Sequence, residues 1–461
     1  MPPDEGDHSV ESPGSAIVVT TSPSYAAATP ISQLQTPSLQ AAMTSQDIYL
    51  CTTIDLMAAN GTQQSLDYFI HHVECFTLTL IDAINWQLFK EHAALMADRC
   101  IILDAAIRAL QAIHKGQANG IALTKAASMR PSTTIRRDVR NRAYTQLWPG
   151  TEPEAMTFDL LLDENGIASR RIIATFSRHP VSTIDSRIAA WLLIAHAAAR
   201  RGGNTGLLSS TLRNCLEHHY YAHPLPPVLP TDPRVPLPTE VSILAALTAP
   251  IFDMCTRIQI IAGHTADLSH YHRSRITADD QEEVNMLLKQ LETQLHDLWK
   301  QRTPLLRHDS VQIRESLAAP IAIPFLRQTR ICKAMYHTEV VEVGRILSDP
   351  PFASDEARVH MRAIRDLVME ELEANNTNEE ADKALPVGFL RPLFLHAIES
   401  LYEHESTWAI KEMRRIKDSI CRSDFFARFA EGLCQAQRAK RRRVTTRWFC
   451  LEAFDVTPPY L

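Results

Sequence analysis

Hydrophobic residues recur at every third or fourth position through most of the chain, beginning with "SLDYFIHHVECFTLTLIDAI" at residues 65–84. Positions three and four apart share one face of an α-helix, so this spacing predicts one amphipathic helix. The next segment, "CIILDAAIRALQAIHKG", repeats the spacing, pairs Asp104 with Arg108 four residues later, and has Gly116 as its expected helix end. Its apolar stripe comprises Ile102, Ala106, Ala109, Leu110 and Ile113.

The same pattern predicts helices along the rest of the chain, at residues 184–200, 206–222, 240–262, 281–301, 325–347, 355–374, 390–403, 406–420 and 423–440. No strand–helix–strand alternation occurs, and no turn of the Asn-Gly type separates two β-branched runs. The expected fold class is therefore all-α, an array of packed helix pairs with a disordered N-terminal tail.

One predicted helix carries a heptad stripe of about two repeats. Its members are Val284, Leu288, Leu291, Leu295 and Leu298. Stable coiled coils usually need more repeats, so the stripe is expected to pack on a neighbouring helix, with a homodimer seam as the alternative.

Three stretches interrupt the helical pattern. Residues 1–45 are more than half Ser, Thr, Pro and Ala, which predicts a disordered low-complexity tail before one helical region at 46–461. Seven prolines in residues 224–238 exclude a helix there and predict an extended connection between two halves of the region. Residues 373–386 are polar and predict a surface loop.

Composition and charge narrow the class of protein. The net charge of −6 is unlike that of a protein holding nucleic acid over a broad surface. Residues 1–89 hold nine acids and no Lys or Arg, which disfavours a mitochondrial or secretory leader. The apolar run at 188–199 is too short to span a bilayer, so no membrane is expected. The nine cysteines are scattered singly, which disfavours a zinc cluster or disulfide framework and favours buried thiols.

Two histidine clusters raise a metal hypothesis. They are Glu217, His218, His219 and His223, and His264, Asp267, His270 and His272. A zinc site needs three or four converging ligands, and the helical HExxH order is absent from both clusters. We therefore expect a polar helix end at the first cluster, and no metal or cofactor at either cluster.

Motifs of other enzymes are missing. The chain has no GxSxG nucleophile elbow, no GxxxxGK[ST] phosphate loop and no GxGxxG after a strand. "RGGNTG" at 201–206 is expected to be a turn between helices, and the pair Glu370–Glu371 lies in a polar stretch where exposure is expected. The sequence therefore predicts that the chain is not an enzyme. A helical enzyme or scaffold that uses one of the histidine clusters is the alternative.

Three helical stretches resemble the fungal-specific transcription factor domain, the helical region downstream of a binuclear zinc-cluster finger in many fungal regulators. They are "LDYFIHHVECFTLTLIDAINWQLFKEHAALMADRCIILDAAIRALQAIHKG" (66–116), "LLKQLETQLHDLWKQRTPLL" followed by "RICKAMYHTEVVEVGRIL" (287–306 and 330–347), and "GFLRPLFLHAIESLYEHESTWAIKEMRRI" (388–416). Their order along the chain carries the likeness over about residues 45–455.

The resemblance implies a transcriptional regulator in the nucleus, with the cytoplasm as a second location. It would act through other regulators or a small-molecule effector, with a secondary-metabolite gene cluster as its expected target. The family's six-cysteine finger and its basic linker are missing from the first 50 residues. DNA contact is therefore expected to be indirect or weak.

The basic run "KRRR", comprising Lys440, Arg441, Arg442 and Arg443, follows the stripe of the last predicted helix. Cations at a helix C-terminus favour the helix dipole, so a solvated helix end explains the run. An exposed basic cluster also fits a nuclear-import signal, our candidate site, and weak sequence-blind DNA contact is a third interpretation. All three interpretations expect the four side chains to be exposed, since an unpaired charge is rarely buried.

Overall fold

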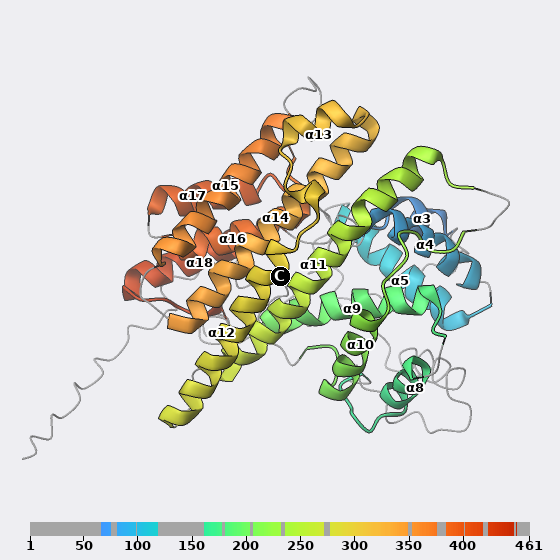
Figure 1. The fold of residues 1–461 in the computed structure, drawn as a ribbon, viewed down its shortest axis with the longest axis horizontal. Coiled ribbons are helices and arrows are strands. Elements are labelled where there is room, and N and C mark those ends of the chain that lie inside the picture. Colours follow the sequence, from blue (N-terminus) through green and yellow to red (C-terminus); the bar gives the residue numbers. More distant parts are fainter. Residues whose placement is uncertain are drawn as a thin grey trace, which may run out of the picture.

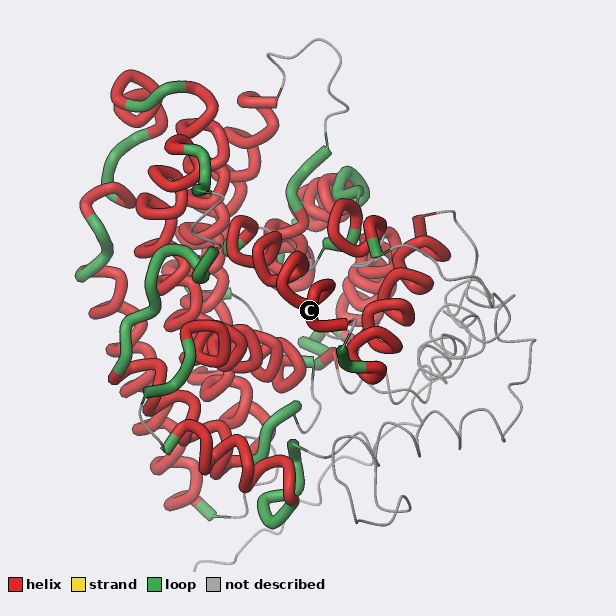
Figure 2. The backbone as a smooth tube through the Cα atoms, turned by 90° about the vertical axis from the view of Figure 1, so that its right-hand side faces the viewer, coloured by secondary structure: helices red, strands yellow, loops and turns green. Residues whose placement is uncertain are grey.

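A computed structural model describes the helical part of the chain. The described residues are 66–74, 81–97, 99–118, 161–177, 180–202, 206–231, 236–271, 277–348, 353–375, 384–400, 402–417, 423–446 and 449. Every regular element among them is an α-helix or a short 3-10 helix, and none is a strand (Figure 2). The all-α prediction is therefore confirmed, whereas the predicted tail at 1–45 lies outside the described residues.

Two long helices form the centre of the molecule. α11 (Thr239–Tyr271) packs along α14 (Ala319–Ser348), with α9 (Thr183–Arg201) against α11 and α15 (Asp355–Asn375) against α14 (Figure 1). Their contact faces are mainly apolar and buried. The largest fully buried side chains of the two central helices are Ile251, Ile258 and Phe325.

α11 is the one described helix whose length and composition would allow it to cross a membrane. Buried core helices satisfy the same test, and α11 contacts α9, α12 (Ala278–Lys300) and α14 along its length. We therefore assign α11 to the core of the array.

The C-terminal helices form a second layer against α14. α16 (Leu390–Glu399), α17 (Glu403–Met413) and α18 (Ser423–Lys440) contact one another in turn. The predicted stripe of α18 is buried at all four positions, namely Phe425, Phe429, Leu433 and Ala436.

The heptad stripe of α12 packs inside the chain. Leu288 and Leu295 are fully buried, and Val284 packs with Leu288 against Ile346 of α14. α12 begins at a Thr277 cap, while α13 (Ser310–Ser316) begins with an Asp309 capping box. The preferred interpretation of the stripe, a helix packing on its neighbour, is confirmed for its buried members Val284, Leu288 and Leu295.

The N-terminal helices are α3 (Asp67–His72), α4 (Ala83–Ala97), α5 (Ile101–Ala118), α8 (Ile167–Phe176) and α10 (Ser210–Ala222). The prediction of one helix over residues 65–84 is wrong, because α3 ends at His72 and Val73 is extended. The carbonyl of Val73 accepts hydrogen bonds from Lys90 Nζ (3.1 Å) and Trp86 Nε1 (3.3 Å) of α4. These tertiary contacts replace the next helical turn.

The stripe predicted for α5 is also partly wrong. Ala106 is exposed whereas Ile107 is buried against α3 and α4, and the helix continues past Gly116 to Ala118. The pairing of Asp104 with Arg108 is confirmed at 2.8 Å.

Several other helix ends differ from the predicted ones. α10 begins at Ser210 rather than 206, because Ser209 caps it. α14 begins before the predicted 325 and includes Pro324 near its start. α16 ends at Glu399 rather than 403, and α17 covers 403–413 rather than 406–420.

The proline-rich connection forms no helix where the structure describes it, at 224–231 and 236–238, and it does not separate two cores. One hydrophobic cluster includes residues from both sides of it, from Ile81 to Phe449. The connection lies against the N-terminal helices, with the backbone N–H of Leu229 bonded to Asn85 of α4 (2.7 Å).

Candidate functional sites: the basic run and a buried polar cleft

The basic run begins at the last residue of α18 and turns sharply. Arg441 has φ 49°, the only positive φ among the described non-glycine residues. The N–H of Arg441 donates to the carbonyl of Arg438 (3.2 Å), and that of Arg442 donates to Gln437 (3.3 Å). This pair of bonds is a Schellman motif, which ends the helix and satisfies two of its free carbonyls.

Arg443 points into the protein, contrary to the expectation that all four cations are exposed. Its guanidinium pairs with Glu399 at the end of α16, whose side chain is fully buried. Arg345 of α14 contacts the same carboxylate at 2.9 Å. The next residue, Val444, is buried, and its N–H donates to Gln437 Oε1 (3.1 Å). The end of the run is therefore attached to the core by an ion pair and an apolar anchor.

Two cations of the run remain fully at the surface. Arg441 and Arg442 are exposed, whereas Lys440 is half-buried. The folded chain thus presents an Arg441–Arg442 corner rather than four equivalent cations. A partner that binds the folded run would meet two guanidinium groups at this turn.

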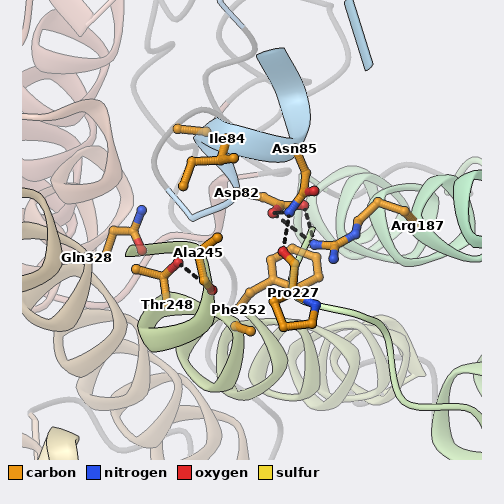
Figure 3. A pocket seen from close by; sticks show the side chains of 11 residues that line it. Asp82, Ile84, Asn85, Arg187, Pro227, Ala245, Thr248, Phe252 and Gln328 are labelled. Atoms are coloured by element: carbon orange, nitrogen blue, oxygen red, sulfur yellow. Dashed lines mark hydrogen bonds and ion pairs between the residues drawn. The ribbon is translucent and has the colours of Figure 1, made fainter. Parts of the chain in front are cut away.

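A second site is a polar cleft between α4, α9, α11, α14 and the proline-rich connection (Figure 3). Asp82, just before α4, is buried and accepts hydrogen bonds from Arg187 Nη1 (2.9 Å to each oxygen), Trp191 Nε1 (2.9 Å) and Asn85 Nδ2 (2.8 Å). Burial raises the pKa of the Asp82 carboxyl, and Arg187, Asn85 and Trp191 oppose that rise. The buried charge is therefore stabilised by an opposite charge and directed donors.

The same residues attach the proline-rich connection. Arg187 Nη2 donates to the carbonyl of Pro226, and Asn85 Nδ2 donates to that of Pro227 (2.9 Å). The guanidinium of Arg187 also lies 4.9 Å from the centre of the Phe252 ring of α11. One buried arginine thus joins α9, α11, the connection and the residue before α4.

The cleft has little free space. Its cavity volume is about 10 Å³, which is about what one water molecule needs. Gln328 of α14 lines it, and its Oε1 is buried with no hydrogen-bond partner among the described residues. The arrangement suits a single water or a structural joint, and an organic effector would enter only if the connection moved.

The histidine clusters join each other rather than forming separate sites. Glu217 of α10 contacts His264 of α11 at 3.1 Å, and Asp267 pairs with Arg213. His219 is buried and lies 3.0 Å from the hydroxyl of Ser186. The predicted polar helix end is confirmed, since α10 ends at Ala222 with His223 as its C-cap.

Neither cluster assembles a metal site in the described residues. His218 is exposed, and the side chains of His270 and His272 lie outside the described residues. Within the described ranges, no three His, Cys, Asp or Glu side chains converge on a point that could hold a metal ion.

The expectation of exposure for Glu370–Glu371 is wrong for one of the pair. Glu371 is buried and pairs with Arg330 (2.7 Å) and Arg327 (2.9 Å) of α14, whereas Glu370 remains exposed. Consecutive helical residues point about 100° apart, so one faces α14 and the other faces solvent.

Sequence reasoning missed Asp82, Arg187 and Glu399 as buried charges. Only Arg187 gave a local signal of a buried charge. It stands beside the apolar run 188–199, and a cation on a buried helix requires a buried partner.

Comparisons with known proteins give no match for this chain: no family model, no curated protein and no solved structure matches it.

Proposed function

We propose that this chain is a transcriptional regulator that works through its helical region in the nucleus. The observation that carries the proposal is the order of the three stretches that resemble the fungal-specific transcription factor domain. They correspond to α3–α5, to α12 with α14, and to α16–α17. An all-α array is also the kind of fold that such a region would have.

The proposed regulator has no DNA-reading finger in the described residues or in its cysteine pattern. It therefore acts on DNA indirectly, through other regulators, or through weak sequence-blind contact. A small-molecule effector, a homodimer and a secondary-metabolite gene cluster as target remain parts of the proposal. The chain is not an enzyme in this proposal, and the alternative that uses a histidine cluster has less support because Glu217, His219 and His264 bond to neighbouring helices.

Nuclear entry depends, in this proposal, on the exposed part of the basic run. Replacing Arg441 and Arg442 by Gln removes both surface guanidinium groups without touching the ion pair of Arg443. The tagged variant is expected to lose nuclear accumulation while its thermal unfolding stays close to that of the wild type. A matched control replaces two exposed arginines elsewhere, Arg362 of α15 and Arg428 of α18, and should enter the nucleus normally.

Equal nuclear levels of wild type and the Arg441/Arg442 variant would show that the run only ends a helix. A wild-type chain excluded from the nucleus would contradict the location itself. A wild type that prefers one DNA sequence at physiological salt would contradict the proposed absence of a DNA reader.

A further inference from the structure

A pair of histidines outside both sequence clusters lies between α14 and α15. The Nδ1 atoms of His337 and His360 are 2.8 Å apart, and the ring centres are 4.9 Å apart. Both side chains are partly exposed, so the pair is reachable from solvent. Because the two Nδ1 atoms are within hydrogen-bond distance, one of them carries a proton and donates it, and the other accepts it.

Both imidazoles are neutral at neutral pH. Burial lowers the pKa of His337 to about 3, and the neighbouring His360 and Lys333 act in the same direction. Burial also lowers the pKa of His360, against the opposing effect of Glu356.

The spacing of the nitrogens fits one coordination geometry better than another. With bonds of about 2.0 Å, adjacent ligands lie about 2.8 Å apart at a right angle and about 3.3 Å apart at the tetrahedral angle. The observed 2.8 Å is the length of a hydrogen bond between the two rings, and it is also close to the separation of two adjacent corners of a square-planar or tetragonal site. That geometry, with nitrogen and oxygen ligands, is typical of Cu²⁺ and Ni²⁺.

A carboxylate is in position to assist. Glu356 is exposed one helical turn before His360 on the same face of α15, and its charge acts on the His360 ring. It does not converge with the two histidines in the described arrangement, so it would join only by a change of rotamer. The negative charge of Glu356 would offset the positive charge of Lys333. Lys333 lies one turn before His337 on α14.

We propose that His337 and His360 form a binding site for Cu²⁺ or Ni²⁺, in which the ion replaces the hydrogen bond between the two Nδ1 atoms and the Nδ1 proton moves through solvent to Nε2 of the same ring. The two imidazoles supply adjacent ligands, and water and Glu356 complete the coordination. This site is independent of the transcriptional proposal.

Trp299 of α12 offers a local signal for binding. Its ring lies 6.1 Å from that of His337 and stacks at 4.0 Å on Tyr336. Cu²⁺ bound at the histidine pair should quench this tryptophan, and the difference between wild type and Trp299→Phe isolates that signal. The titration uses CuCl₂ with the full chain, and excess glycine suppresses weak binding to surface histidines.

The wild type is expected to bind one Cu²⁺ with quenching of Trp299. His337→Asn and His360→Asn should each weaken the dissociation constant by about tenfold or more, and Glu356→Gln should weaken it less. His223→Asn is the matched control, because it removes one member of another close histidine pair, with rings 4.5 Å apart. It should bind like the wild type. The proposal is overturned if both His→Asn variants, shown to be folded by circular dichroism, bind Cu²⁺ like the wild type, or if Trp299 is not quenched.

Discussion

Gly206 is the glycine, among those in the described residues, at which the fold leaves least room for a Cβ atom. Its φ is +90°, and an added Cβ would lie 2.4 Å from Cε1 and 2.8 Å from Nδ1 of His196. Gly206→Ala is therefore expected to lower the free energy of unfolding by about 2–3 kcal/mol, from backbone strain and the clash together. Chemical denaturation of the wild type and the variant measures this loss of unfolding free energy.

Gly344 of α14 is the matched control for this substitution. A Cβ there would meet no atom within 4 Å, and alanine is the better helix former. Gly344→Ala should leave stability unchanged or raise it by up to about 1 kcal/mol. An equal loss in both variants would contradict the close approach of Gly206 to His196.

His196, which bonds to this turn, makes the unfolding free energy depend on pH in the acid range. Its Nδ1 accepts the N–H groups of Leu207 (3.1 Å) and Leu208 (3.0 Å), so a proton on Nδ1 would face two donors. Burial, followed by the charge of Arg213, lowers the pKa of His196 to about 4. The unfolded chain takes up this proton near pH 6.5, so the stability contribution is present above that pH and is lost as the pH falls toward 4.

Between neutral pH and about pH 5, His196 alone should account for a loss of about 2 kcal/mol in unfolding free energy. His196→Gln keeps a hydrogen-bonding side chain but does not titrate, so its stability should depend less on pH over this range. An identical pH dependence in wild type and variant would contradict the buried neutral imidazole.

At the scale of elements, the end of α18 depends on one arginine of the basic run. Arg443→Gln leaves the buried Glu399 with Arg345 as its remaining ionic partner and should cost about 2 kcal/mol. Arg442→Gln removes an exposed cation and should change stability by less than about 0.5 kcal/mol. Equal effects in chemical denaturation would mean that Arg443 is as solvated as its neighbour.

The proline-rich connection is attached by a single amide side chain as well as by Arg187. Asn85→Ala removes its bonds to Pro227 and Leu229, and should speed hydrogen exchange in residues 224–231 by about tenfold or more. Exchange elsewhere should change little. Asn214→Ala, at an exposed position of α10, is the control and should leave the connection protected. Unchanged protection in Asn85→Ala would show that Arg187 and packing suffice.

Helix identity could be predicted from the sequence, because the stripes of α12 and α18 bury the leucines and phenylalanines that their spacing brings to one face. Helix ends were less predictable where a tertiary contact decides them, as at Val73, whose carbonyl accepts hydrogen bonds from Lys90 and Trp86.

The candidate sites were harder to predict from the sequence than the helix ends. Asp82 and Arg187 are 105 positions apart, so no local pattern reveals their ion pair. Nor does the run of four cations reveal that Arg443 has a buried partner 44 positions away.

At the scale of the whole molecule, the described helices share one main core across the proline-rich connection. Residues 1–45 are expected to contribute nothing to that core, since their sequence has few large apolar side chains. Deleting them should keep the thermal midpoint within about 2 °C of the full chain. A much larger fall in a calorimetric scan would show that the tail packs on the helices.

The central claim, regulation of transcription through the helical array, is tested most directly by fusing the chain to a DNA-binding domain of known site. Reporter output from that site is measured beside the DNA-binding domain alone, with nuclear levels matched. The account predicts that the fusion raises or lowers the output, and that Leu393→Asp, which charges a fully buried position of α16, abolishes the effect. A wild-type fusion that is present in the nucleus and leaves the output unchanged would contradict the account.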